Sequence, residues 1–173
     1  SAFSAKGVFP SEMCDRVLQK FAALCKHDQR FIVPPEKMRE ILVCPIPNTP
    51  ENEWIFNKVL EIVKKVNSDV FKLDIDGVET VQLVCYEKGH FHDWHIDFRN
   101  QRKLSISIEL SDPSDYEGAK LTFGMTDKHT YAIPNICKGD ATVFTSVIRH
   151  KVTPLTQGKR YALVAWITGP PFK

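Results

Sequence analysis

Residues 86–97 read YEKGHFHDWHID, a stretch dense in side chains that bind metal ions. Residues i and i+2 of an extended segment point to the same side, so His95 and Asp97 can hold one ion together. With six histidines and 21 acidic residues in the chain, about 0.7 such pairs arise by chance. The pair therefore carries weight only together with further residues.

His150 is the first of these further residues, because it follows another strand-like run. Two imidazoles and one carboxylate form a facial triad with open coordination positions, an arrangement suited to Fe(II) and oxygen chemistry. Arg160 lies ten residues beyond His150, and the Pro and Gly of 153–158 suit a turn. A hairpin centred on residue 155 would place Arg160 opposite His150, where its guanidinium can bind a carboxylate whose other end chelates the metal.

The second half of the chain alternates apolar and polar residues, as strands do. We expect at least five strands, at 80–86, 104–110, 119–123, 141–147 and 160–167. Within 104–110, Ser105, Ser107 and Glu109 form a polar face, which must meet solvent or a polar cavity. Helices followed by many short strands predict an α+β fold with a mostly β core, a jelly roll (double-stranded β-helix) backed by helices on one side.

The first half reads as helical. Ser11 can cap a helix whose apolar residues continue to Cys25, and Thr49 with Pro50 can open a second helix that reaches Val66. Between them, the Pro-punctuated segment 30–48 contains short extended pieces at 31–33 and 41–43. It is either a connector packed on the core or a flap over an active site.

Composition limits the classes of function. The 173 residues are 43% hydrophobic and 25% charged, with a net charge of +2, so we expect one domain: a helical support region over 1–79 and a jelly-roll core over 80–173. This balance argues against nucleic acid or an anionic membrane as main partner. The longest apolar run, 161–167, is shorter than the roughly 20 residues of a membrane span. Five cysteines without a C-x-x-C pair, and no export leader, favour a cytoplasmic protein.

Three motifs resemble one family. The first, Y-x-x-G-x(5)-H-x-D, runs from Tyr86 to Asp97; the second covers 104–118, and the third extends from Gly139 to Trp166. Together they resemble the Fe(II)/2-oxoglutarate-dependent dioxygenases, in their prolyl-4-hydroxylase-like branch. One departure is the pair at 119–120, Ala-Lys, where relatives often carry Gly-Glu.

The resemblance implies a role for each matching residue. The iron ligands would be His95, Asp97 and His150, and Arg160 would bind the distal carboxylate of 2-oxoglutarate. Tyr86 would help to hold this cosubstrate through its hydroxyl, and two serines of suitable parity, Ser105 and Ser107, would line the pocket. The implied reaction consumes O₂, converts 2-oxoglutarate to succinate and CO₂ and hydroxylates a substrate C–H bond, with ascorbate as a possible reductant.

Several alternatives stay open at this point. The substrate implied by resemblance is a protein or peptide side chain such as proline, and the other enzymatic choice is a free amino acid or small metabolite. A catalytically decayed jelly-roll binding module is the non-enzyme hypothesis, although such a module should have lost one of the four key residues. His90 and His92 read as loop residues, and the alternative is a contact with substrate at the rim or support of His95. A structural zinc at His92 and His95 would need a helix there. His27 and His129 have no visible partners in the sequence.

Overall fold

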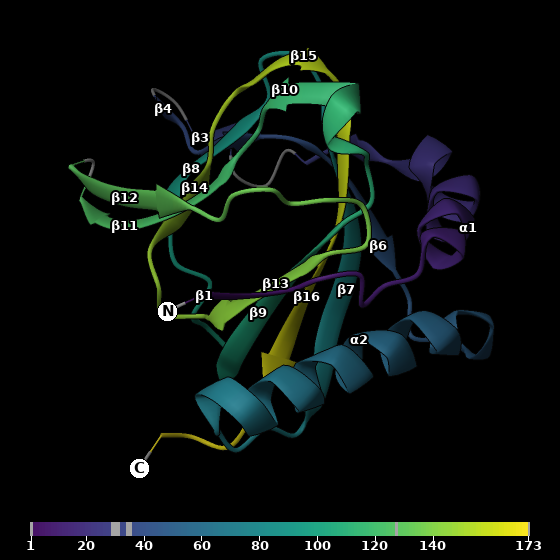
Figure 1. Ribbon diagram of the computed structural model, residues 1–173, viewed down its shortest axis with the longest axis vertical. Coiled ribbons are helices and arrows are strands. Elements are labelled where there is room, and N and C mark those ends of the chain that lie inside the picture. Colours follow the sequence, from purple (N-terminus) through teal and green to yellow (C-terminus); the bar gives the residue numbers. More distant parts are fainter. Residues whose placement is uncertain (1, 29–31, 34–35, 127, 173) are drawn as a thin grey trace.

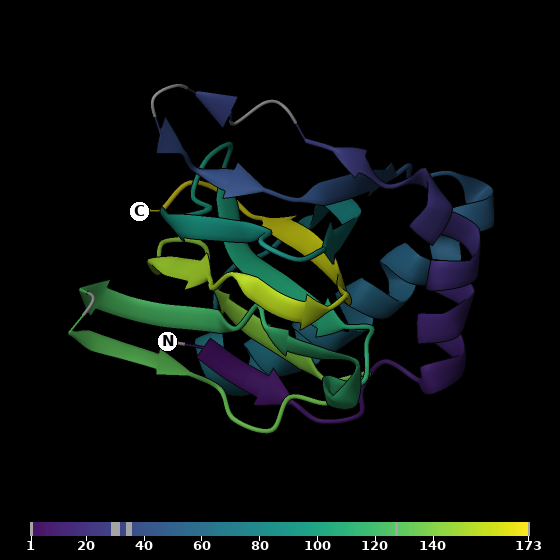
Figure 2. The same cartoon turned by 90° about the horizontal axis from the view of Figure 1, so that it is seen from above.

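Two antiparallel sheets face each other, and helices cover the outer face of the larger one (Figures 1 and 2). The computed structural model describes residues 2–28, 32–33, 36–126 and 128–172. In spatial order, the larger sheet contains β1 (Ala2–Ala5), β13 (Ala141–Thr145), β9 (Arg102–Glu109), β16 (Arg160–Thr168), β7 (Gly77–Tyr86), β6 (Leu42–Ile46) and β2 (Lys26–His27). The smaller sheet contains β12 (His129–Ala132), β11 (Leu121–Thr126), β14 (His150–Val152), β8 (Phe91–His95) and β5 (Arg39–Glu40). The described part of the chain holds no helix long and apolar enough to cross a membrane.

Two short ribbons complete the strands. One pairs β10 (Tyr116–Gly118) with β15 (Leu155–Gly158), and the other pairs β3 (Ile32–Val33) with β4 (Glu36–Lys37). The predicted extended pieces near 31–33 and 41–43 thus correspond to β3 and β6, although residue 31 lies outside the described residues. The flap hypothesis for 30–48 falls partly on residues outside the described ranges, and it stays a prediction.

The helices α1 (Ser11–Phe21) and α2 (Glu53–Val66) are amphipathic and pack on the larger sheet. The short helical turns are η1 (Ala22–Leu24), η2 (Pro50–Asn52), η3 (Asn67–Phe71) and η4 (Pro113–Asp115). Six side chains of α2 are buried in the core, and each contributes about 1.5–3 kcal/mol when fully buried: Ile55, Phe56, Val59, Ile62, Val63 and Val66. Ser11 is the first helical residue and not the cap, a position that Pro10 takes. Thr49 precedes Pro50 as predicted, but it caps the short turn η2 and makes no side-chain capping bond.

The alternation along β9 separates two environments. Leu104, Ile106 and Ile108 are fully buried among the residues beneath the helices. Ser105 and Glu109, of the opposite parity, are also buried, with 0% and 3% of their surface exposed. The polar face of this strand therefore turns toward the space between the two sheets. Of the two predicted environments, the polar cavity is the correct one, and the predicted jelly roll is confirmed.

The first half of the chain contributes more than helices. β1 pairs with β13 at one edge of the larger sheet, and β6 pairs with β7 toward the other edge. The short strand β5 also pairs with β8, the strand that carries the metal-binding motif. The interpretation of the first half as helical was therefore incomplete. β6 corresponds to the extended piece expected at 41–43, whereas β1 and β5 are too short to show a period in the sequence.

The predicted hairpin between His150 and Arg160 is wrong. His150 begins β14 in the smaller sheet, whereas Arg160 begins β16 in the larger one. The segment expected to turn forms the strand β15, which pairs with β10. Gly158 ends it at φ +79°, where an added Cβ would lie 2.0 Å from a backbone oxygen. The Pro and Gly of this segment therefore lie in a connection that leads from the smaller sheet to the larger one, and not in a tight turn.

Candidate active site

His95, Asp97 and His150 converge at one point between the sheets. His95 ends β8 and His150 begins β14, and these two residues are direct partners in the antiparallel register. The Nε2 atoms of His95 and His150 lie 3.3 Å and 3.5 Å from Oδ1 of Asp97. One ligand atom from each residue lies within 4.8 Å of the others. This spacing places two imidazole nitrogens and one carboxylate oxygen around a site for a single ion.

Backbone carbonyls orient both imidazoles. Nδ1 of His95 lies 2.7 Å from the carbonyl oxygen of Asp93, and Nδ1 of His150 lies 3.0 Å from that of Ile148. A carbonyl only accepts hydrogen bonds, so each Nδ1 carries the proton and each Nε2 keeps a free lone pair. This is the tautomer that metal-binding histidines adopt when a backbone oxygen supports them.

Asp97 is held so that one of its oxygens stays available. Ser105 donates its hydroxyl proton to Oδ2 of Asp97 over 2.8 Å, and the Asp97 backbone N–H donates to the carbonyl oxygen of Ser146. Burial alone would raise the pKa of Asp97, but the adjacent imidazole of His95, the nearby His150 and the hydrogen bond from Ser105 keep it below its usual range. Asp97 is therefore an anion whose Oδ1 faces the two imidazoles.

Burial keeps the neighbouring histidines neutral. It lowers the pKa of His150, and it lowers that of His92 to about 2, with His95 adding to the effect on His92. His92 lies on β8, with its ring stacked on that of His95 at 3.6 Å between centroids. The interpretation of His92 as a loop residue is therefore wrong, and so is the helix that a zinc site at His92 and His95 would have needed.

Two cavities meet beside the triad. A small one of about 60 Å³ is lined by the triad, by Tyr86 on β7 and by Arg39 on β5. A larger one of about 680 Å³ extends between β11, β13 and the segment 132–137. Three residues line both cavities: Ser107, Leu121 and Arg160. Arg160 thus lies within the same polar interior as the triad although the two come from opposite sheets.

Arg160 is buried and paired with Glu109. Its Nε donates to Oε2 of Glu109 over 3.0 Å, and Nη1 donates to the backbone oxygen of Ala119 over 3.1 Å. Burial of the guanidinium would lower its pKa, but Glu109, Tyr116 and Tyr86 hold the pKa of Arg160 above its usual value. An arginine has five N–H donors, so these bonds leave the guanidinium able to bind a further carboxylate.

The other predicted cosubstrate residues occupy different places. Tyr86 is the register partner of Arg160, and burial raises its pKa to about 12, so the hydroxyl stays protonated. Ser107 lines both cavities, as its parity suggests. Ser105 lies behind Asp97 and donates to it. The predicted roles of Tyr86, Ser105 and Ser107 toward the cosubstrate stay predictions. Glu109 received no role from the sequence, although it shares the polar face of β9 with both serines.

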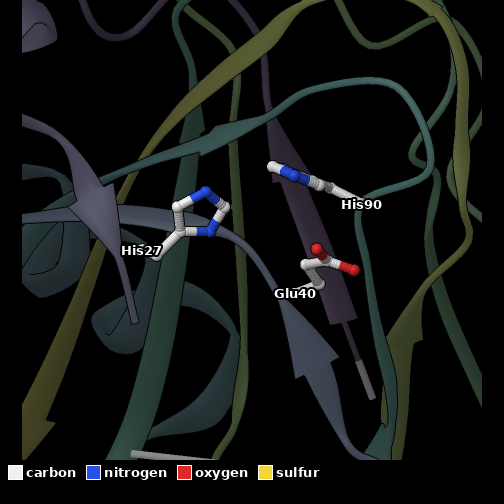
Figure 3. A group of neighbouring side chains, drawn as sticks. All are labelled: His27, Glu40 and His90. Carbon is white, nitrogen blue, oxygen red and sulfur yellow. The ribbon is translucent and has the colours of Figure 1, made fainter. Parts of the chain in front are cut away.

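A second group could be mistaken for a metal site. His27 on β2, Glu40 on β5 and His90 before β8 gather around one point (Figure 3). Here, however, Nδ1 of His90 accepts a hydrogen bond from the backbone N–H of Glu87 over 3.1 Å. That contact uses the lone pair of Nδ1 and leaves the proton on Nε2, so neither nitrogen is free for a metal. The two groups thus differ in the backbone partner of the imidazole Nδ1. In the triad this partner is a carbonyl oxygen, which accepts a hydrogen bond, and at His90 it is an N–H group, which donates one.

The triad fits a divalent transition metal. Imidazole and carboxylate ligands suit Fe(II), and two histidines with one carboxylate leave open positions for further ligands. His95, Asp97 and His150 are the residues that would hold it. Arg160, charged and buried, lines the small cavity together with the triad, and its role toward the distal carboxylate of a cosubstrate stays a prediction.

Comparison with known proteins identifies the family. The model of the 2OG-Fe(II) oxygenase superfamily matches residues 81–168, just over half of the chain. A PKHD-type hydroxylase of Maricaulis maris is 34% identical over 86 residues, 47% of this chain and 38% of that protein. One of Pseudomonas paraeruginosa is 34% identical over 96 residues, 47% of this chain and 40% of that protein. The matched segment thus spans only about two fifths of these relatives.

Solved structures share the fold at low sequence identity. A prolyl-4-hydroxylase of Pseudomonas putida has a TM-score of 0.75 at 17% identity, with 98% of this chain and 93% of that chain covered. A prolyl hydroxylase of Trichoplax adhaerens, solved with a peptide fragment of the hypoxia inducible factor oxygen degradation domain, has a TM-score of 0.76 at 19% identity, with 97% and 83% covered. With the family match and the geometry of the triad, we conclude that this chain belongs to the 2OG-Fe(II) oxygenase superfamily.

Proposed function

We propose that the protein is an Fe(II)- and 2-oxoglutarate-dependent hydroxylase that acts on a side chain of a protein or peptide. One observation carries the proposal: the Nε2 atoms of His95 and His150 converge on Oδ1 of Asp97, with both Nδ1 atoms facing carbonyl oxygens. The cytoplasm is the proposed location, and ascorbate is the proposed reductant that keeps the iron in its Fe(II) state.

Different residues would bind the metal and the cosubstrate. His95, Asp97 and His150 would hold iron, and Ser105 keeps the Asp97 carboxylate turned toward it. Arg160 would bind the distal carboxylate of 2-oxoglutarate, with the protonated hydroxyl of Tyr86 as a second donor. The bound iron and cosubstrate supply the oxidising chemistry, in which 2-oxoglutarate is converted to succinate and CO₂ while one oxygen atom of O₂ enters a substrate C–H bond.

Exposed apolar residues next to the predicted iron ligands in the sequence support a peptide substrate. Ile96 and Phe98 flank the buried Asp97 and are 53% and 44% exposed. Trp94 precedes His95, and the cationic groups of Arg149 and Lys151 lie 4.5 Å and 4.6 Å from its ring centroid. Exposed apolar and aromatic groups beside a reactive centre are the usual means of holding an extended chain. The two structural relatives are prolyl hydroxylases, which also supports a prolyl side chain as the target.

The proposal can be tested by product analysis. The protein is incubated with Fe(II), 2-oxoglutarate, ascorbate and O₂, together with a panel of proline-containing peptides or with free amino acids. We expect peptide-dependent formation of succinate and a peptide that gains the mass of one oxygen atom, both abolished in Asp97→Ala. If the protein hydroxylates free amino acids and none of the peptides, its substrate is a small metabolite and not a peptide. Succinate formation that is unchanged in Asp97→Ala would contradict the proposed iron site.

A further inference from the structure

A carboxylate of the protein, that of Glu109, already pairs with the guanidinium that is expected to bind the cosubstrate's distal carboxylate. Glu109 on β9 and Arg160 on β16 lie on adjacent strands, with Glu109 opposite Ala162 in the register. Ala162 is two residues from Arg160, so Glu109 and Arg160 face the same interior. Both line the larger cavity, and both are nearly inaccessible to solvent, with exposures of 3% and 4%.

Glu109 is anchored on one side only. Its Oε2 accepts hydrogen bonds from Nε of Arg160 over 3.0 Å and from the hydroxyl of Tyr116 over 3.2 Å. Its Oε1 is buried and has no hydrogen-bond partner among the described residues. A buried carboxylate with an unsatisfied oxygen depends on its cation for stability, since breaking such a pair leaves an uncompensated charge in the interior.

A ligand carboxylate at Arg160 therefore meets a guanidinium that is already neutralised. In the water-poor interior, two carboxylates around one guanidinium repel each other more strongly than they would in solvent. We infer that Glu109 is a specificity-determining residue, a built-in competitor that lowers the affinity of Arg160 for the distal carboxylate of the cosubstrate. This inference rests on the proposed function, because it takes 2-oxoglutarate to be the ligand of Arg160.

The variant Glu109→Gln tests the competition. The amide oxygen can still accept the bonds from Arg160 and Tyr116, while the negative charge is lost. We expect 2-oxoglutarate to bind the metal-loaded variant at least about fivefold more tightly than the wild type, with metal affinity unchanged. The measurement is anaerobic calorimetric titration with Mn(II) as the metal, which needs no turnover.

Two controls separate charge at Arg160 from general effects. Glu117→Gln removes an exposed carboxylate that lines the same cavity and makes no hydrogen bond to Arg160 among the described residues. We expect its affinity for 2-oxoglutarate to change by less than about twofold. The second control is 2-oxopentanoate, which has the same carbon chain without the distal carboxylate. Its affinity should be the same for wild type and Glu109→Gln within about twofold.

A measurement on the wild type covers the case in which Glu109→Gln does not fold. With Glu109 competing, 2-oxoglutarate should bind the wild type less than about tenfold more tightly than 2-oxopentanoate. A larger ratio would overturn the inference, as would a Glu109→Gln variant that binds 2-oxoglutarate with equal or lower affinity. Glu109 would then only position Arg160. Failure of 2-oxoglutarate to bind the metal-loaded wild type at all would instead contradict the proposed function.

Discussion

The hydroxyl oxygen of Ser105 lies 2.8 Å from Oδ2 of Asp97, and this bond joins the polar face of β9 to the metal-binding motif. Ser105 is fully buried, and its hydroxyl also lies 3.1 Å from that of Ser146. Two serines thus fix the rotation of the Asp97 side chain and leave Oδ1 as the oxygen that faces His95 and His150. The triad is therefore preformed by hydrogen bonds on its far side.

Removal of the Ser105 hydroxyl should loosen the metal site. Groups behind metal ligands commonly contribute about 10–100-fold in metal affinity, and we expect a loss of this size in Ser105→Ala. Titration with Fe(II) or Mn(II) measures it, and thermal unfolding checks that the fold is retained. Ser107→Ala, two residues along the same face, is the matched control and should keep its metal affinity. Equal effects of both variants would show that Ser105 does not act through Asp97.

Only the triad should bind a metal ion tightly. We expect one Fe(II) or Mn(II) per chain, lost in His95→Ala and retained in His90→Ala, because Nδ1 of His90 faces a backbone N–H. Metal analysis after gel filtration measures the stoichiometry. A second metal ion per chain that is lost in His90→Ala would show that His27, Glu40 and His90 do bind metal.

The Arg160–Glu109 pair should behave as a coupled buried ion pair. Arg160→Met leaves the carboxylate of Glu109 buried without its cation, and we expect a loss of about 3–5 kcal/mol in the free energy of unfolding. The double variant Arg160→Met/Glu109→Gln removes both charges and should recover part of this loss. Urea unfolding of the four proteins gives the coupling energy. If the losses of the two single variants simply add, the two charges do not interact.

The same variants should separate stability from cosubstrate binding. The double variant lacks the guanidinium, so we expect it to bind metal but to bind 2-oxoglutarate much more weakly than the wild type. Calorimetric titration of the metal-loaded protein makes the comparison. Restored 2-oxoglutarate affinity in the double variant would mean that Arg160 does not contact the cosubstrate.

Asp140 should make stability depend on pH. Its carboxylate accepts hydrogen bonds from the backbone N–H groups of Gly7 and Cys137, each over 2.8 Å, and from Lys6 over 2.9 Å. Burial would raise the pKa of Asp140, but these three donors hold it below its usual value. A lowered pKa means that the carboxylate stabilises the fold above the unfolded pKa of about 3.9, and that this contribution is lost as the pH falls.

Asp140→Asn should therefore be less stable than the wild type by about 2 kcal/mol at pH 7, since hydrogen bonds to a charged group are lost and an amide faces N–H donors. The difference should shrink as the pH falls below about 4, where the Asp140 carboxyl of the unfolded chain becomes protonated before that of the folded protein. Urea unfolding at several pH values measures it. A difference that is constant across this range would contradict the role of the Asp140 charge.

The sequence was sufficient to predict the long strands and to show that the polar residues of β9 lie on one face. Alternation along 104–110 showed that Ser105, Ser107 and Glu109 share a face, and the fold confirmed that this face turns inward. The short strands β1, β5 and β14 could not be predicted, because two to four residues carry no detectable period and their pairing depends on distant segments. The prediction for 153–158 failed for a related reason: Pro and Gly mark a change of direction without showing which sheet the chain enters next.

Side-chain partnerships were the other part that the sequence did not show. The alternation along β9 predicted that Ser105 and Glu109 point toward the interior. It did not predict that Ser105 bonds to Asp97 or that Glu109 pairs with Arg160. These contacts depend on how β9 and β16 are aligned, and that alignment is set by many backbone pairs together. Likewise, the sequence contained His27 and His90 without showing that they meet Glu40 across fifty residues of chain.

The proposed function requires the triad and Arg160 to bind one iron ion and one 2-oxoglutarate molecule together. The decisive measurement is anaerobic addition of Fe(II) and then 2-oxoglutarate to metal-free protein, followed by visible absorption. We predict a metal-to-ligand charge-transfer band that requires both additions and is absent in His150→Ala. A folded wild-type protein that never shows the band, or a band that persists in His150→Ala, would contradict the central claim.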